Sequence, residues 1–322
     1  GCGACEAVCP TDVFQLTNVD WNAFFERAKD ILGSGKEKVL RVECCKIPIT
    51  TLSPDRYTHG QVLRIPCFAV ITSSIFLKLF ILGAERVDVV DGDLCRVCES
   101  KIGVDKIRRV ISASNYLLNR IEYAGSVSIV AEPVAGKDIV SVNRVLKEYM
   151  KEKAVSRRQL FSSIKKEIAI GVANTIPDMP EENDEVARPI KIIPFERQNL
   201  LAGIKGLCKE YEERQVISPF FPQVKINNTC NNCQLCTKIC PTDALRKIDA
   251  EDGQGISFIA SLCTGCNLCR YLCPKKAITL EEEPVDISII LNNTETRLIW
   301  FEKTQCSRCE KIFVSLNNSS IC

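Results

Sequence analysis

CNNCQLCTKICPTDAL, residues 230–245, and CTGCNLCRYLCPKKAI, residues 263–278, are two copies of one cysteine pattern. Both follow C-x2-C-x2-C-x3-C-P, with a proline directly after the fourth cysteine. The short spacing lets one tight loop supply three thiolates, while the fourth thiolate must come from elsewhere in the fold. Four converging thiolates are the ligand set of a [4Fe–4S] cube. The pattern therefore predicts two cubes, and a pair of four-cysteine zinc sites is the alternative.

This segment, about residues 222–284, closely resembles the bacterial two-[4Fe–4S] ferredoxin domain. In such domains the fourth cysteine of each run ligates the cluster of the other run, so two crossed ligand sets are expected. The first set is Cys230, Cys233, Cys236 and Cys273, and the second set is Cys263, Cys266, Cys269 and Cys240. Between the runs, residues 244–249 and 255–260 are expected to pair as a hairpin.

A third copy of the pattern opens the chain, where residues 1–14 read GCGACEAVCPTDVF. It is similar to the same ferredoxin family and offers Cys2, Cys5 and Cys9, while its first cysteine would lie before Gly1. Unrelated thiols are the alternative. At the other end, Cys322 closes the chain as if it were the third ligand of a set of four. We therefore expect the chain to be a piece of a longer protein, so every count of metal sites is a minimum.

Strand and helix signals alternate between the cysteine motifs. Apolar residues within Asn18–Leu32 share one helical face, and two further helical patterns cover Phe68–Leu82 and Asp105–Ile121. Short β-type runs are expected at Val39–Val42, Val62–Ile65, Val87–Val90 and Val127–Val130. This alternation predicts a parallel α/β sheet. Residues 174–198 contain four prolines and an acidic cluster, which is typical of a linker.

Cysteines follow three of these predicted strands. The set is Cys44, Cys45, Cys67, Cys95 and Cys98. Because the carboxyl ends of parallel strands meet at one edge of a sheet, these thiols are expected to converge there. Four thiolates suit a [2Fe–2S] cluster or tetrahedral zinc, whereas buried thiols packed as small hydrophobic groups are the structural alternative.

The middle of the chain also resembles a family. VLRIPC at residues 62–67, LGAERVDVVDGDLCRVC at 82–98 and the pair Arg108-Arg109 are similar to the hydrogenase iron–sulfur subunit family, typified by the delta subunit of methyl-viologen-reducing hydrogenase. The resemblance covers about Val39–Val130 and implies a [2Fe–2S] site at Cys45, Cys67, Cys95 and Cys98. The family has a wider first cysteine set than the adjacent pair found here, so the choice between Cys44 and Cys45 stays open.

The last cysteines of the chain resemble three of the four ligands of a zinc ribbon. They are Cys306, Cys309 and Cys322. A further iron–sulfur cluster and an unstructured tail are the alternatives.

Composition narrows the function. Twenty of the 322 residues are cysteine and only one, His59, is histidine, so cysteine carries the chemistry. A net charge of +2 gives no reason to expect nucleic acid as a partner. No membrane span is expected, because the most apolar run, Ile65–Gly83, contains polar residues and a proline. No secretory segment opens the chain, so a cytoplasmic location is the default expectation.

The whole pattern indicates an α/β plus α+β protein in five segments. They are a truncated ferredoxin-type motif at 1–17, an α/β domain at 18–135, a helical segment and linker at 136–221, a two-cluster ferredoxin domain at 222–284, and an incomplete zinc ribbon at 285–322. We expect an electron-transfer subunit of an anaerobic redox complex, with a hydrogenase, a dehydrogenase or a heterodisulfide-reductase-type flavoprotein as partner. No P-loop, GxGxxG or nucleophile elbow indicates a catalytic subunit. The rivals are a metal-stabilised interaction module and a thiol or iron–sulfur enzyme using the cysteines of the middle domain.

Overall fold

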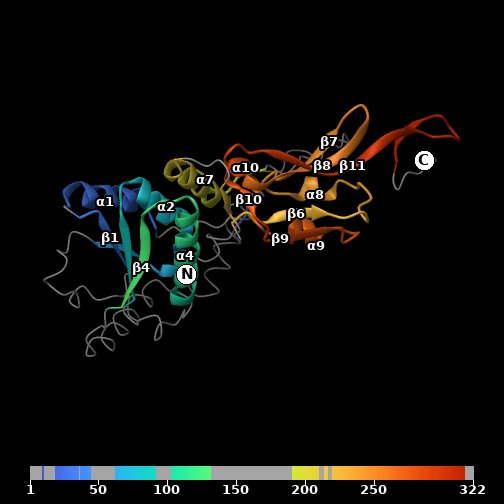
Figure 1. Ribbon diagram of the computed structural model, residues 1–322. Helices are drawn as coiled ribbons and strands as arrows, with labels where there is room; N and C mark the ends of the chain where they lie inside the picture. The colour runs from blue at the N-terminus through green and yellow to red at the C-terminus, as the bar shows by residue number, and fades with distance from the viewer. Residues whose placement is uncertain are drawn as a thin grey trace, which may run out of the picture.

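The computed structural model describes residues 9–10, 19–35, 37–44, 62–91, 103–131, 191–209, 214–216 and 220–315. Some predicted features lie outside these ranges. They are Cys2, Cys5, Cys45, His59, Cys95, Cys98 and Cys322. Figure 1 shows the described elements in two groups, with helix α7 between them.

The first group is built on a parallel sheet. Its strands are β1 (Val39–Cys44), β2 (Val62–Ile65), β3 (Arg86–Asp91) and β4 (Ser126–Ala131), in the order β2-β1-β3-β4. All four predicted strands are present within two residues of their expected limits, and the prediction of a parallel sheet is confirmed. Because β1 has β2 on one side and β3 on the other, the strand order reverses at β1. In open α/β sheets, ligands bind beside the carboxyl ends of strands at such a reversal.

Helices cover this sheet and complete its core. They are α1 (Trp21–Ser34), the 3-10 turn η4 (Phe68–Val70), α2 (Ser73–Ile81) and α4 (Gly103–Arg120). Asp20 caps α1 by accepting a hydrogen bond from the backbone N–H of Ala23, at 3.0 Å. The single helix expected over Phe68–Leu82 is divided, because the chain is extended at Ile71 and Thr72.

Helix α7 (Phe195–Leu207) packs against α2 and joins the two groups. A Cβ on Gly203 would lie 2.6 Å from the Cβ of Leu77, so only glycine permits this close helix contact. The linker predicted for residues 174–198 is wrong at its end, where residues 195–198 form the first turn of α7. Proline explains the error, since Pro194 directly precedes the helix, where the fixed backbone angle of proline is tolerated.

The second group contains three small antiparallel sheets. Strand β6 (Gln223–Ile226) pairs with β9 (Ile278–Glu281), and β5 (Gln215–Val216) pairs with β10 (Val285–Asp286). The third sheet has the order β12-β11-β8-β7, from Ile312–Val314, Glu295–Gln305, Gly253–Ile259 and Leu245–Asp249. Strands β7 and β8 form the expected hairpin, and β11 extends their sheet beyond residue 284. The short helices are α8 (Leu235–Ile239), η5 (Ala260–Leu262), α9 (Leu268–Tyr271) and α10 (Ile287–Leu291).

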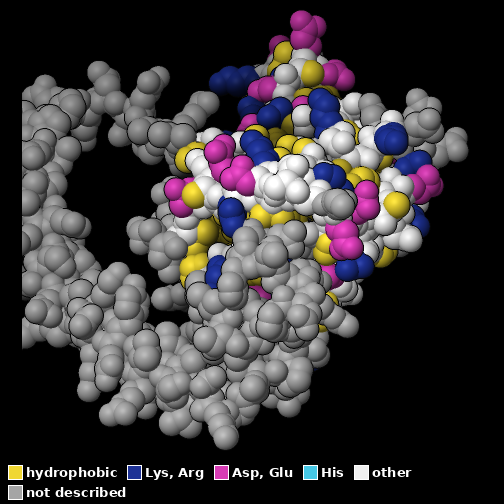
Figure 2. Space-filling view, turned by 90° about the vertical axis from the view of Figure 1, so that its left-hand side faces the viewer, with side chains coloured by type: hydrophobic (Ala, Val, Ile, Leu, Met, Phe, Trp, Pro, Cys, Tyr) yellow, Lys and Arg dark blue, Asp and Glu magenta, His cyan; other side chains and the backbone are white. Residues whose placement is uncertain are grey.

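Within the described ranges, no helix has both the length and the apolar character needed to cross a bilayer. On the face drawn in Figure 2, Lys and Arg side chains are interspersed with Asp and Glu, in keeping with the small net charge.

Candidate metal centres

Two small cavities in the second group are each bordered by four cysteines. We call them cavity 1 and cavity 2. Cavity 1 is bordered by Cys230, Cys233, Cys236 and Cys273. Cavity 2 is bordered by Cys240, Cys263, Cys266 and Cys269. Three cysteines of each set come from one loop and the fourth comes from the other copy of the motif. The fold therefore gathers the thiols in the crossed arrangement that the spacing implies.

The two loops have the same backbone conformation at equivalent positions. Asn232 and Gln234 have φ of 55° and 59°, while Gly265 and Asn267 have φ of 69° and 63°. Asp243 and Lys276, each three residues after the fourth cysteine of a run, have φ of 60° and 51°. Glycine and asparagine tolerate this left-handed region best, which explains their place around the second and third cysteines. The repeat in sequence is thus a repeat in three dimensions.

Backbone N–H groups are directed at the cysteine sulfurs. The N–H of Ala277 donates to Cys273 Sγ at 3.3 Å, and backbone groups of Asn232 and Thr237 hydrogen-bond to Cys230 and Cys236. In the second loop, Gly265 and Arg270 do the same for Cys263 and Cys269. Such bonds stabilise negative charge on sulfur and are one of the ways a protein sets a cluster potential.

Burial opposes thiolate formation at these sites. Burial, followed by the neighbouring thiols, raises the pKa of Cys236 and of Cys269 to about 12 each. Burial likewise raises the pKa of Cys263 to about 11. A cation is needed to balance four buried thiolates, and the iron ions of a cluster supply that charge. The donor set, the hydrogen-bonded sulfurs and the apolar walls therefore fit a [4Fe–4S] cube in each cavity.

The same two strands form part of both cavities. The cross-strand pair Val224 and Leu280 borders cavity 2, whereas the pair Ile226 and Ile278 borders cavity 1. Residues two positions apart on a strand lie about 7 Å apart on one face. The strand pair β6–β9 therefore places the two cavities next to each other.

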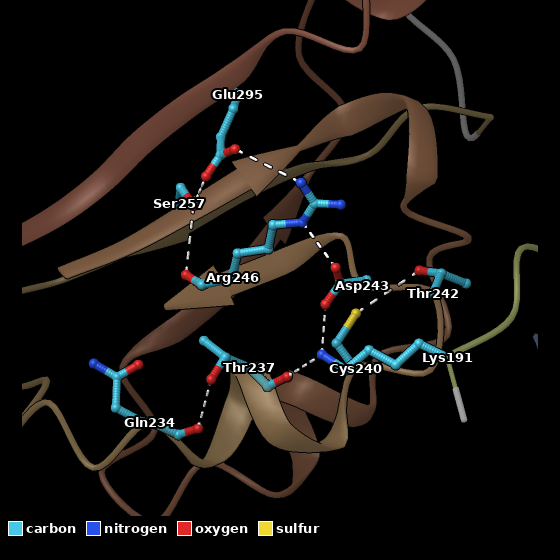
Figure 3. Close-up of polar contacts among 9 residues, drawn as sticks. All are labelled: Lys191, Gln234, Thr237, Cys240, Thr242, Asp243, Arg246, Ser257 and Glu295. Carbon is cyan, nitrogen blue, oxygen red and sulfur yellow. Dashed lines mark hydrogen bonds and ion pairs between the residues drawn. The ribbon is translucent and has the colours of Figure 1, made fainter. Parts of the chain in front are cut away.

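A network of polar side chains holds the segment that carries Cys240, as Figure 3 shows. Lys191 Nζ donates to the carbonyl oxygen of Thr237 at 2.8 Å and pairs with Asp243 Oδ1 at 2.5 Å. Arg246 pairs with Asp243 at 2.8 Å, and Thr242 Oγ1 lies 3.8 Å from Cys240 Sγ. Together these contacts connect α8, the turn after Cys240 and strand β7.

Comparison with known families identifies this part of the chain. Residues 224–280 match the sequence profile of the 4Fe-4S dicluster domain. That range contains both cavities, so the expectation of a ferredoxin-type domain is confirmed. No curated protein matches the chain. The family match therefore assigns residues 224–280 to a dicluster domain and says nothing of the other residues.

The cysteines of the middle region are placed only in part. Cys44 is the last residue of β1, and its side chain is buried in the core beside Leu40 and Val42. Its sulfur lies 3.6 Å from the carbonyl oxygen of Pro66. Cys67 precedes η4, and its sulfur accepts a hydrogen bond from the N–H of Ala69 at 3.4 Å. The described members of this set therefore do lie at the carboxyl edge of the sheet, while the other members lie outside the described residues.

The two ends of the chain are placed less completely. Cys9 borders a cavity that is also bordered by Thr264, between Cys263 and Cys266, so Cys9 lies near the second loop of the dicluster domain. Cys306 is buried and begins the turn between β11 and β12, in which Cys309 is exposed. Among the described residues, no group of three or more His, Cys, Asp or Glu side chains is gathered around the position of a single metal ion, so no third metal ligand accompanies Cys306 and Cys309 there. The four cysteines of cavity 1 and of cavity 2 instead surround a space for a cluster. The zinc ribbon stays a prediction.

The charged pair Glu196 and Arg197, at the start of α7, is not predicted from the sequence. Glu196 accepts hydrogen bonds from the hydroxyls of Thr72, at 2.7 Å, and of Ser74, which lie at the start of α2. Arg197 is buried, donates to the carbonyl oxygen of Cys263 and stacks on Phe221, with 5.1 Å to the ring centroid. Pro194 followed by an acidic first turn is a helix-start signal that would have indicated the helix. No local pattern indicates that Arg197 is buried.

Proposed function

We propose that this chain is an iron–sulfur electron-transfer protein that relays single electrons between partners in a redox complex. The observation that carries the proposal is the crossed gathering of eight cysteines around two adjacent cavities within a 4Fe-4S dicluster domain. The dicluster domain is consistent with electron transfer, and the fold gives its cysteines the surroundings that a redox centre requires.

In this proposal, Cys230, Cys233, Cys236 and Cys273 hold one cube, and Cys240, Cys263, Cys266 and Cys269 hold the other. When bound, such a cube accepts or releases one electron at a time. The protein contributes four thiolates to each centre, backbone hydrogen bonds to their sulfurs, and apolar walls that exclude water. Shared strands β6 and β9 keep the two centres at a fixed and short separation.

The parallel-sheet region would exchange electrons with a partner subunit. Its resemblance to hydrogenase iron–sulfur subunits supports a [2Fe–2S] site at Cys45, Cys67, Cys95 and Cys98. Cys44 is buried among Leu40 and Val42, which favours Cys45 as the ligand of the adjacent pair. Partners of the hydrogenase, dehydrogenase or heterodisulfide-reductase type are part of the proposal and rest on the family resemblance alone.

The test is to purify the whole chain without oxygen and count iron and acid-labile sulfide. Electron paramagnetic resonance then follows the reduced centres of the wild type and of single Cys→Ser variants. Cys273→Ser should disturb the same centre as Cys233→Ser, although it lies in the other sequence copy. Cys266→Ser is the matched comparison, because it should disturb the other centre.

Electron transfer itself is measured by mixing the reduced protein with oxidised cytochrome c as an artificial acceptor. Each cube that returns to its oxidised state reduces one haem iron, so the rise in reduced cytochrome should equal the number of reduced centres. Zinc in place of iron, or a Cys273→Ser variant that disturbs the same centre as Cys266→Ser, would contradict the proposal.

A further inference from the structure

A cavity of about 410 Å³ lies between the parallel-sheet part and the dicluster domain. Its walls come from the start of α2, residues 106–113 of α4, the first half of α7, the loop that carries Cys263, and Cys9. The bordering residues on which the proposed binding depends are Lys106, Arg109, Glu196, Arg197, Phe220 and Thr264. A volume of this size lies within the range of about 300–1,000 Å³ that is usual for small-molecule sites.

Two buried polar atoms at this cavity have no hydrogen-bond partner in the part of the chain that the structure describes. They are Nη1 of Arg197 and Oγ1 of Thr264, and Thr264 also borders cavity 2. Arg197 is only 6% exposed, and its other terminal nitrogen, Nη2, is already bonded to the carbonyl oxygen of Cys263. Because a buried charged donor is costly to leave unsatisfied, a guanidinium that borders a cavity and has one terminal nitrogen without a partner indicates a missing acceptor.

The charges around the cavity favour an anion. Among the described residues that border the cavity, Lys106, Arg109 and Arg197 are three cations, against the one carboxylate of Glu196. That carboxylate is already engaged by the hydroxyls of Thr72 and Ser74. The N-terminal ends of α2 and α7, where backbone N–H groups favour negative charge, also border the cavity. The cavity is therefore electropositive without any bound group.

Apart from Thr72 and Ser73, most of the remaining wall is apolar. It includes Val110, Leu200 and Phe220. An inorganic ion alone would leave these walls in contact with water, whereas a molecule with an apolar body would cover them.

We infer that this cavity binds a small molecule with an oxyanion head, either a phosphate ester or a carboxylic acid, and an apolar body. The oxyanion accepts from Nη1 of Arg197 and from Thr264, while Lys106 and Arg109 balance its charge. Guanidinium groups match the geometry of carboxylate and phosphate oxygens, and the phenyl ring of Phe220 packs on the apolar body.

The bound anion would also affect the centre at cavity 2, a consequence that rests on the proposed function. Arg197 contacts both the cavity and the carbonyl of Cys263, so an anion on Nη1 offsets the positive charge beside that centre. Reduction adds one negative charge to the centre. The anion should therefore lower its midpoint potential and leave the centre at cavity 1 nearly unchanged.

The test uses the whole iron-loaded chain and titration calorimetry with three probes that carry the same ring, which are phenyl phosphate, benzoate and the neutral benzyl alcohol. The expected result is one saturable site for at least one anion and none for benzyl alcohol. Arg109→Gln and Lys106→Gln should each weaken binding about tenfold, the scale of one charged contact, and Arg197→Gln should weaken it further. Arg108→Gln is the matched control, since this exposed neighbour on α4 does not border the cavity.

Each outcome is decisive. Binding of phenyl phosphate alone identifies a phosphate ester, and binding of benzoate alone identifies a carboxylic acid. No saturable binding, or equal weakening by Arg108→Gln, would overturn the inference. Iron content and circular dichroism show whether each variant is folded. Calorimetry tests whether the cavity binds an anion, even if the protein transfers no electrons. A titration of the midpoint potential with the anion bound tests only whether that anion affects the centre at cavity 2.

Discussion

The buried guanidinium of Arg197 donates a hydrogen bond to the backbone carbonyl oxygen of Cys263, the first cysteine of the second motif. Arg197 belongs to α7, outside the residues that match the dicluster family, so the contact joins the domain to a part of the chain beyond it. Burial lowers the pKa of Arg197 to about 10, which still keeps it charged at neutral pH. The described residues that border cavity 1 include Lys275 and no arginine.

We predict that this charge makes the centre at cavity 2 easier to reduce. A unit charge about 10 Å away contributes about 1–2 kcal/mol at an effective dielectric constant of 20, or on the order of 50 mV for one electron. Arg197→Met should therefore lower the midpoint potential of that centre by tens of millivolts, whereas Arg197→Lys should lower it less. A potentiometric titration followed by electron paramagnetic resonance measures both centres together, so the centre at cavity 1 is the internal control. Equal shifts of both centres would contradict the prediction.

Glu196 should make the stability of the protein depend on pH. Burial raises the pKa of this carboxyl above its usual 4.5, while hydrogen bonds from Ser74 and Thr72 oppose the shift. Because the folded pKa is raised, the contribution of Glu196 to stability is complete below about 4.5 and is lost as pH rises through the raised value. Glu196→Gln should flatten this part of the profile.

The measurement is the Tm from circular dichroism between pH 5 and pH 8. Glu196→Ala is the comparison, because it removes the acceptor of Thr72 and Ser74 and should lower stability at every pH by about 1–3 kcal/mol. A Glu196→Gln variant with the same pH profile as the wild type would show that the carboxyl does not titrate in this range.

The left-handed positions in the two loops predict substitutions of opposite effect. Gly265 has φ of 69°, and a Cβ there would lie 3.3 Å from Cγ of Pro222. Gly265→Ala should therefore destabilise the domain by about 1–2 kcal/mol. Gln234 also lies in the left-handed region, with φ of 59°, but lacks the conformational freedom of glycine. Gln234→Gly should therefore stabilise the domain by up to about 1 kcal/mol. Thermal loss of the visible cluster absorption measures both changes, and a Gly265→Ala variant as stable as the wild type would contradict the assignment.

How far the sequence predicts this structure depends on the range of the interactions. The spacing around Cys233 and Cys266 predicts the loops, because three ligands and their turn residues lie within a few positions of each other. The strands of the parallel sheet follow from local β-type runs, and Val62–Ile65 has the limits expected from them. Arg197 was not predicted, since its burial depends on Phe221 and Cys263, which come from other parts of the chain.

The cysteines of the parallel sheet give a further prediction. Cys67 caps η4 through its sulfur at the carboxyl edge of the sheet, whereas Cys44 is packed in the core. Cys67→Ser in the whole chain should therefore remove a [2Fe–2S] signal and about two irons, while Cys44→Ala should retain both. Absorption, iron and sulfide measurements distinguish the two variants. A signal that survives Cys67→Ser would favour the alternative in which these thiols are buried structural groups.

The turn between β11 and β12 gives the last prediction. Cys306 donates its N–H to the carbonyl oxygen of Lys311 at 2.9 Å and accepts from the N–H of Glu310 at 2.9 Å, which closes a tight turn around Cys309. A cysteine pair in such a turn is one half of a ribbon-type zinc site, and the rest must come from residues further along the chain. The full-length protein should bind about one zinc, and Cys309→Ser should abolish that binding without changing the iron count. Zinc and iron are measured together in the same sample by plasma mass spectrometry. Additional iron in place of zinc would make this turn part of another electron-transfer centre, and no added metal would leave it a simple hairpin.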